Sequence, residues 1–125
     1  MTARTRILLL AHGSSDRRWC ETFEALAAPT LGSLPEARVA YMELAEPSLE
    51  AEVEKAVAEG ITDIRVVPLF LAAGRHLRKD VPAMLDAYRD RLGVQVTLLP
   101  PIGEDPRLGL ALKDIVADSL EATHD

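Results

Sequence analysis

The chain has 125 residues, of which 48% are hydrophobic and 27% charged, and a net charge of -6. This length and composition predict a single folded domain over residues 1–125 and exclude a disordered chain. No apolar run reaches about 18 residues, which excludes a membrane-spanning helix. The acidic balance argues against a nucleic-acid-binding surface, while a single cysteine, Cys20, and the lack of a recognisable signal peptide predict a cytoplasmic protein without an internal disulfide.

Short apolar runs alternate along the chain with segments of helical periodicity. Strands are expected at about 6–12, 38–43, 63–71 and 94–99, and helices at about 16–30, 47–60, 77–92 and 105–121. Repeated strand–helix units of this kind predict a parallel sheet. Right-handed crossovers allow the strand order 2-1-3-4, in which the first and third strands are central neighbours of a flavodoxin-like three-layer sandwich with helices on both faces.

Each predicted helix carries an apolar stripe at helical spacing. The first has Trp19, Phe23 and Leu26, and the last has Leu108, Leu112, Ile115 and Val116. Such stripes normally face a core, so we expect both helices to cover the sheet and Trp19 to be a packing residue rather than a ligand platform. Pro47 and Pro106 fit the first turns of the second and fourth helices, and Asp105 fits the cap of the fourth.

Two histidines follow strands that this topology makes neighbours. His12 closes the first strand, and His76 follows the third strand and a short run of small residues. Ligands bind such sheets at the carboxyl ends of the strands where the strand order reverses, so we expect the two imidazoles to face each other. Glu43, which alternates with Tyr41 along the second strand, is a better carboxylate partner than Glu46, which suits a helix N-terminus. Two imidazoles and a carboxylate can bind a divalent transition metal or accept protons.

Basic side chains gather around the second histidine. They are Arg75, Arg78 and Lys79, and Arg17 with Arg18 stands on the corresponding loop after the first strand. In a chain of negative net charge, these cations indicate a site for a carboxylate- or phosphate-bearing ligand, although a solvated helix start explains any one of them equally well. Ser14 fits either an anion contact or a helix cap. No glycine-rich nucleotide-binding motif is present, so no nucleotide cofactor is expected.

Three blocks of the sequence resemble, in their order and spacing, the short form of the CbiX sirohydrochlorin chelatases. The blocks are residues 10–14, 43–48 and 67–76, followed by Asp80-Val81-Pro82. This resemblance implies the class II chelatase fold and the insertion of Co2+ or Fe2+, or Ni2+ in some relatives, into sirohydrochlorin, a tetrapyrrole with eight carboxylates. It implies no organic cofactor.

The resemblance also implies roles for individual residues. His12 and His76 match the metal-binding histidines, and Glu43 matches their acidic partner. The tetrapyrrole carboxylates would contact Ser14 and the three basic residues around His76. One departure is Ser15-Asp16 after the His-Gly-Ser sequence, where many relatives have Arg-Asp. Longer relatives hold two such domains facing one cleft, so the resemblance implies a homodimer with the macrocycle between its subunits.

Two other functions are compatible with these residues. A non-catalytic metal or tetrapyrrole carrier would use the same histidines, since ligand sets for storage and for insertion can be identical. A phosphoryl-transfer enzyme would need a phosphohistidine at His12, but the usual Arg-His-Gly arrangement is absent because Ala11 precedes the histidine. Turnover of sirohydrochlorin with each metal separates insertion from storage.

Overall fold

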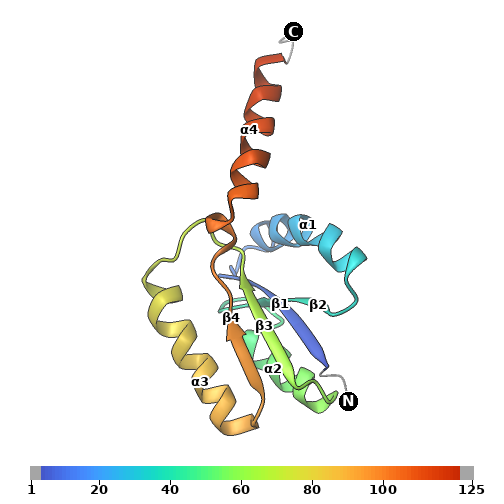
Figure 1. Cartoon of the computed structure of the whole chain (residues 1–125), viewed down its shortest axis with the longest axis vertical. Helices are drawn as coiled ribbons and strands as arrows, with labels where there is room; N and C mark the ends of the chain where they lie inside the picture. Colours follow the sequence, from blue (N-terminus) through green and yellow to red (C-terminus); the bar gives the residue numbers. More distant parts are fainter. Residues whose placement is uncertain (1–3, 122–125) are drawn as a thin grey trace.

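The fold is built on one parallel sheet. A computed structural model describes residues 4–121, except for the side chain of His76. Its elements are β1 (Thr5–Ala11), α1 (Arg17–Ser33), β2 (Ala37–Tyr41), α2 (Leu49–Ala58), β3 (Asp63–Pro68), a π-helical turn η1 (His76–Asp80), α3 (Val81–Leu92), β4 (Gln95–Leu98), a 3-10 turn η2 (Ile102–Glu104) and α4 (Pro106–Glu121) (Figure 1). The strand order is β2-β1-β3-β4. The predicted order, with β1 and β3 as neighbours, is confirmed.

The main core lies between the sheet and the helices α2 and α3. The strands alternate their side chains between the two faces of the sheet, and the same positions of neighbouring strands meet in register, such as Leu8 with Val66. These two side chains, with Val53 of α2 and Leu85 of α3, are fully buried in one cluster. Burial of each such side chain contributes about 1.5–3 kcal/mol, and together these contacts hold α2 and α3 against this face of the sheet.

On the other face, α1 covers only part of the sheet. Small residues of α1, Cys20 and Ala27, are buried, whereas Trp19 and Leu26 are 72% and 74% exposed. The expectation that Trp19 packs in the core is therefore wrong. The helix is rotated so that its small residues meet the strands, which leaves its larger apolar side chains at the border of a cavity described below.

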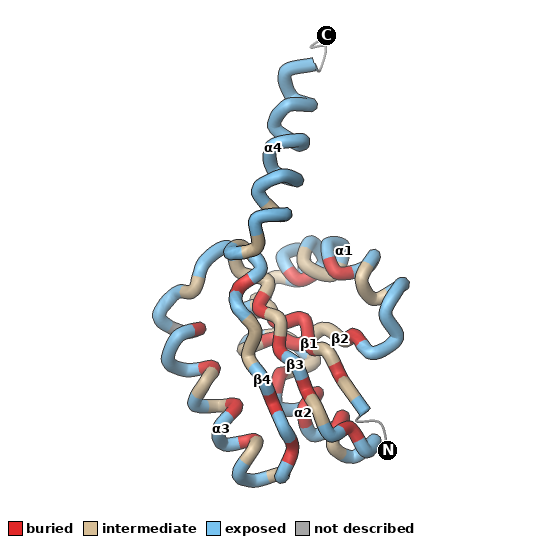
Figure 2. The backbone as a smooth tube through the Cα atoms, in the orientation of Figure 1, coloured by how far each residue is buried: buried red, intermediate tan, exposed pale blue. Residues whose placement is uncertain are grey.

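Helix α4 does not cover the sheet, contrary to the expectation from its apolar stripe. It projects away from the rest of the domain (Figure 1), and its residues beyond Leu108 are exposed (Figure 2). The periodicity correctly indicates an amphipathic helix, but the direction of α4 is set by the turn η2 that precedes it. One face of the sheet therefore has one covering helix fewer than the prediction requires.

The helix ends agree with most of the sequence signals. Gly60 and Gly93 follow α2 and α3 with φ of +86° and +67°, and the Asp105 carboxylate accepts the N–H of Arg107 (2.9 Å) at the start of α4. Pro47 does not start α2, because Ser48 is the N-cap of that helix and accepts the N–H of Ala51. Within residues 4–121, no helix has the length and apolar character needed to cross a membrane.

Candidate functional site

The chain segments that follow β1, β2 and β3 continue side by side beyond the sheet. The Met42 N–H donates to the Ala11 carbonyl (2.9 Å), and the Glu43 N–H donates to the His12 carbonyl (3.0 Å). On the other side of β1, the Leu69 N–H donates to Leu10 (2.9 Å). The carboxyl ends of the central strands therefore form one continuous edge, and His12 lies in its middle.

Gly13 allows the segments that follow β1 and β2 to approach each other closely. Its φ is +94°, and a Cβ added there would lie 1.8 Å from the Glu43 carbonyl oxygen. A residue with a side chain would thus be strained and would also collide with the backbone of the neighbouring loop. Glycine at this position keeps the backbone of His12 beside that of Glu43, which brings together two of the three predicted site residues at the backbone level.

The His12 ring is exposed and stacks on Phe70. The ring centroids are 4.4 Å apart and the ring planes are inclined by 17°. Phe70 comes just after β3, so this contact joins the two central strands of the sheet at its carboxyl edge. The stack restricts the imidazole to one plane while leaving its edge accessible. Phe70 carries no titratable or metal-binding group, so the sequence alone does not indicate its role.

Two cavities meet at the His12–Phe70 ring pair. The larger, about 880 Å³, lies between α1 and the ends of β1 and β3, and the smaller, about 330 Å³, lies along the loop after β3. Both rings line both cavities. The larger is otherwise lined by Ala11, Gly13, Ser14, Arg18, Trp19, Cys20, Thr22, Phe23, Leu26, Tyr41 and Leu69, and the smaller by Leu71, Ala72, Gly74, Arg75 and Leu77. A flat ligand can therefore approach the imidazole from two sides.

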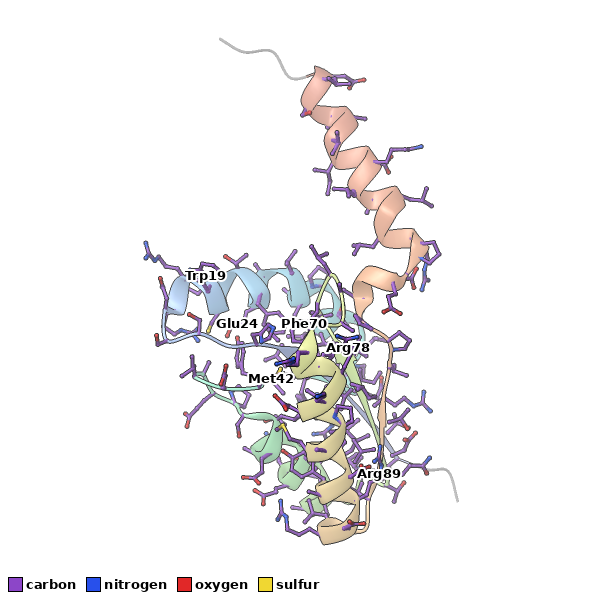
Figure 3. All side chains as sticks on the ribbon, turned by 90° about the vertical axis from the view of Figure 1, so that its left-hand side faces the viewer. Trp19, Glu24, Met42, Phe70, Arg78 and Arg89 are labelled. Carbon is purple, nitrogen blue, oxygen red and sulfur yellow. The ribbon has the colours of Figure 1, made fainter. Side chains whose placement is uncertain are left out.

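A hydrogen-bonded network joins α1 to the end of β2 at the larger cavity. The buried Tyr41 hydroxyl donates to the Glu24 carboxylate (2.6 Å), which also pairs with Arg17 (3.2 Å). The Tyr41 hydroxyl and the Arg17 guanidinium lower the pKa of Glu24, while burial and the Glu24 carboxylate raise the pKa of Tyr41. Figure 3 shows Glu24 on α1 and Phe70 on the loop after β3. Sequence reasoning missed this network because its members are far apart in the chain.

The remaining predicted residues are placed as follows. His76 begins η1, and its side chain lies outside the described part of the structure. Arg75, Arg78 and Lys79 are exposed, and of these Arg75 lines the smaller cavity with His12; Glu43 and Glu46 are exposed. Ser14 lines the larger cavity, but Asp16 rather than Ser14 caps α1; the Ser14 hydroxyl accepts the Asp16 N–H (3.0 Å).

The described side chains do not by themselves form a three-ligand metal site. Among them, no group of three His, Cys, Asp or Glu residues is close enough to hold a metal ion. The predicted set of His12, His76 and Glu43 includes the undescribed His76 side chain, so that set stays a prediction. The exposed His12 imidazole is chemically suited to the transfer of a metal ion, because a single imidazole can bind an ion while the ion's other coordination positions stay open.

The comparisons with known proteins agree with one another on the family of the chain. A model of the CbiX family matches residues 6–119 of the chain. The chain is 30% identical over 117 residues to the sirohydrochlorin cobaltochelatase of Sulfurisphaera tokodaii, which covers 94% of this chain and 95% of that protein. Its structure is similar to the crystal structure of a CbiX protein from Marinobacter aquaeolei VT8, with 59% identity, a TM-score of 0.91, and coverage of 95% of this chain and 99% of that one.

The similarity extends to a protein about twice as long. The sirohydrochlorin ferrochelatase of Bacillus subtilis is 31% identical over 116 residues, which cover 87% of this chain but only 44% of that protein. The chain therefore corresponds to about half of this longer relative, whereas it spans nearly all of the two shorter ones.

Proposed function

Because the chain belongs to the CbiX family, we propose that it inserts a divalent metal ion, Co2+ or Fe2+, into sirohydrochlorin. The observation that carries this function is the position of His12, which is exposed, stacked on Phe70 and shared by two cavities where the strand order reverses. A non-catalytic carrier built on the same histidines is not favoured, because the relatives that are named for their function are chelatases.

The reaction exchanges two pyrrole N–H protons for one metal ion in a flat, stiff ring. A site promotes this exchange by holding the ion through few protein ligands, so that ring nitrogens can take the open positions, and by placing bases nearby. We assign His12 and His76 as metal ligands or, when they hold no metal ion, as proton acceptors. Glu43, whose backbone is bonded to that of His12 (3.0 Å), supplies negative charge and passes protons to solvent. Stacking on Phe70 keeps the imidazole plane constant during the exchange.

The carboxylates of sirohydrochlorin require positively charged side chains around the site. Arg17 and Arg18, at the start of α1, already form ion pairs with acidic side chains at 3.2 and 2.9 Å. We therefore assign the carboxylates to the exposed residues that follow β3, with a further contact at the larger cavity. These residues are Arg75, Arg78, Lys79 and Ser14. Arginine binds carboxylates through paired hydrogen bonds, and Arg75 lines the smaller cavity with His12 whereas Arg78 does not, which makes Arg75 the strongest of these contacts.

Metallation of sirohydrochlorin, followed by absorption spectroscopy, tests the proposal with Co2+, Fe2+ and Ni2+ alone and in competition. We expect catalytic turnover by the wild-type protein and none by His12→Ala, with little change in its circular dichroism spectrum because His12 is exposed. Lys55→Ala, an exposed residue of α2, is the matched control and keeps the wild-type rate. Stoichiometric binding without metallated product would identify a carrier, and normal turnover by His12→Ala would reject the assignment of that residue.

Three finer statements belong to the same proposal. We infer a homodimer that holds the macrocycle between its subunits, which the chain's match to about half of the Bacillus subtilis ferrochelatase supports. Symmetric pairing is the commonest closed assembly. Acceptance of Ni2+ and a cytoplasmic place in cobalamin- or siroheme-type biosynthesis are predictions that the metal competition and cell fractionation test.

A further inference from the structure

Leu44 combines an exposed side chain with a strained backbone. Its side chain is 68% exposed, and its φ of +63° is the only positive value at a non-glycine residue within the described part of the chain. A single exposed leucine is ordinary on a protein surface, but a leucine in the left-handed region is unfavourable because its Cβ crowds the backbone. Glycine would adopt this conformation at a lower cost. The leucine therefore lowers stability without filling the core, as residues of binding sites often do.

Leu44 follows a residue whose backbone is fixed to that of His12. The Glu43 N–H donates to the His12 carbonyl (3.0 Å), and the Glu43 carbonyl oxygen lies only 1.8 Å from the position of a Cβ built on Gly13. These contacts hold the backbone that leads into Leu44 on the β2 side of His12. The place of Leu44 at the edge of the site is therefore fixed, while its side chain stays accessible.

Leu71 occupies the corresponding position on the β3 side of His12. It follows Phe70, whose ring stacks on the imidazole. Its side chain is 79% exposed and lines the smaller cavity with His12 and Arg75. Its backbone is held by η2, because a Cβ at Gly103 would lie 1.7 Å from the Leu71 carbonyl oxygen. Two exposed leucines thus follow the two residues that are bonded to His12 or stacked on it, one on each side of the histidine.

We propose that Leu44 and Leu71 bind the apolar ring of sirohydrochlorin and hold it over His12. The faces of a conjugated macrocycle are apolar, whereas its carboxylates lie around the edge of the ring. The two leucines match the faces, and Arg75, which lines the smaller cavity beside Leu71, matches the edge. The leucines contact the substrate but take no part in the transfer of protons or metal. This inference rests on the chelatase function proposed above, which makes sirohydrochlorin the ligand.

Two replacements of Leu44 separate the side chain from the strained backbone. Leu44→Ala removes most of the side chain and keeps the strain, whereas Leu44→Gly removes both. We expect both variants to raise the KM for sirohydrochlorin at least about fivefold in the metallation assay, with little change in kcat, because an apolar contact with the bound ring is lost. Leu44→Gly should also unfold at a higher urea concentration than Leu44→Ala, since glycine alone relieves the strain.

Leu71→Ala and a matched control complete the kinetic test. Leu71→Ala should raise the KM as the Leu44 variants do. Leu34→Ala replaces an exposed leucine that follows α1 and lines neither cavity, so it should keep the wild-type KM. Binding of metal-free sirohydrochlorin is measured separately, by titration that follows quenching of the fluorescence of Trp19, the only tryptophan of the chain. The Kd should rise in the variants that raise the KM.

The outcomes distinguish this inference from the chelatase function. Metallation by the wild type with an unchanged KM and Kd in Leu44→Ala and Leu71→Ala would overturn the inference and leave the function intact. Binding that both variants weaken, without metallated product from the wild type, would reject the function and support the inference. A wild type that binds no sirohydrochlorin would overturn both. Variants that change the oligomeric state in sedimentation equilibrium but keep the wild-type Kd would assign the leucines to a contact between copies, which also overturns the inference.

Discussion

Replacement of Gly13 by alanine tests whether the contact between the loops after β1 and β2 holds the site together. An alanine at φ +94° is strained by about 1–2 kcal/mol. Its Cβ would also lie 1.8 Å from the Glu43 carbonyl oxygen, so the two loops must separate. This separation breaks the hydrogen bond from the Glu43 N–H to the His12 carbonyl, which contributes about 0.5–1.5 kcal/mol. We expect Gly13→Ala to lower the free energy of unfolding by about 1.5–3.5 kcal/mol.

Two other glycines separate the strain from the collision. Gly93 has φ +67° and nothing within 4 Å of an added Cβ, so Gly93→Ala measures the backbone strain alone, about 1–2 kcal/mol. Gly32, inside α1, has neither a positive φ nor a close neighbour, and Gly32→Ala should stabilise the helix by up to about 1 kcal/mol. The assay is urea unfolding followed by far-ultraviolet circular dichroism at one fixed protein concentration, because the proposed dimer would add to the apparent stability.

The metallation assay completes the comparison. Displacement of the loops moves His12 relative to Glu43, so Gly13→Ala should lose at least about tenfold in turnover, equivalent to about 1.4 kcal/mol in the barrier, whereas Gly93→Ala and Gly32→Ala should retain the wild-type rate. If Gly13→Ala and Gly93→Ala were equally stable and equally active, the contact with Glu43 would have no role, and the reasoning from the close approach would be refuted.

Three further variants probe the surroundings of the site. Phe70→Leu removes the aromatic surface on which His12 stacks, and the metallation rate should fall about two- to tenfold, matching a stack of about 0.5–1.5 kcal/mol. Tyr41→Phe should cost about 1 kcal/mol at neutral pH in urea unfolding. Because the folded-state pKa of Glu24 is lowered, the stabilisation from its contacts is present above the ordinary glutamate pKa of about 4.3 and is lost as the pH falls through the lower folded value. Tyr41→Phe should therefore lose less of its free energy of unfolding in acid than the wild type does. The same dependence of stability on pH in both proteins would contradict the network. Gly103→Ala puts a Cβ 1.7 Å from the Leu71 carbonyl oxygen, which displaces the loop that carries Phe70, so the metallation rate should fall. An unchanged rate would show that η2 does not hold this loop in place.

The sheet could be predicted because its signals are local. Each strand is a short apolar run, each helix has a stripe at its own spacing, and glycines such as Gly60 and Gly93 end helices at the expected places. The strand order then follows from general rules of handedness, and the structure confirms it. The direction of α4 does not follow in this way. An apolar stripe indicates that a helix packs against another surface, but it does not indicate which part of the fold, or which other molecule, provides that surface.

The site shows the same division between local and long-range information. His12 can be predicted as a site residue because a histidine directly after a central strand lies where such folds bind ligands. Phe70 carries no titratable group and resembles an ordinary core residue, although its position after the neighbouring strand was an available signal. The bond between Tyr41 and Glu24 joins residues 17 positions apart on different elements, so no pattern within either element indicates it. Side chains that act through contacts across elements need the fold before they can be recognised.

Phe70 connects the outward helix to the candidate site. Its carbonyl accepts the N–H of Gly103 in η2, and its ring stacks on His12, so the anchor of α4 and the plane of the imidazole depend on the same residue. A Cβ at Gly103 would lie 1.7 Å from the Leu71 carbonyl oxygen, so a side chain there must move either η2 or the loop that carries Phe70. A change in η2 therefore reaches His12 through a single intervening residue, although η2 belongs to a part of the chain that the sequence does not connect with the site.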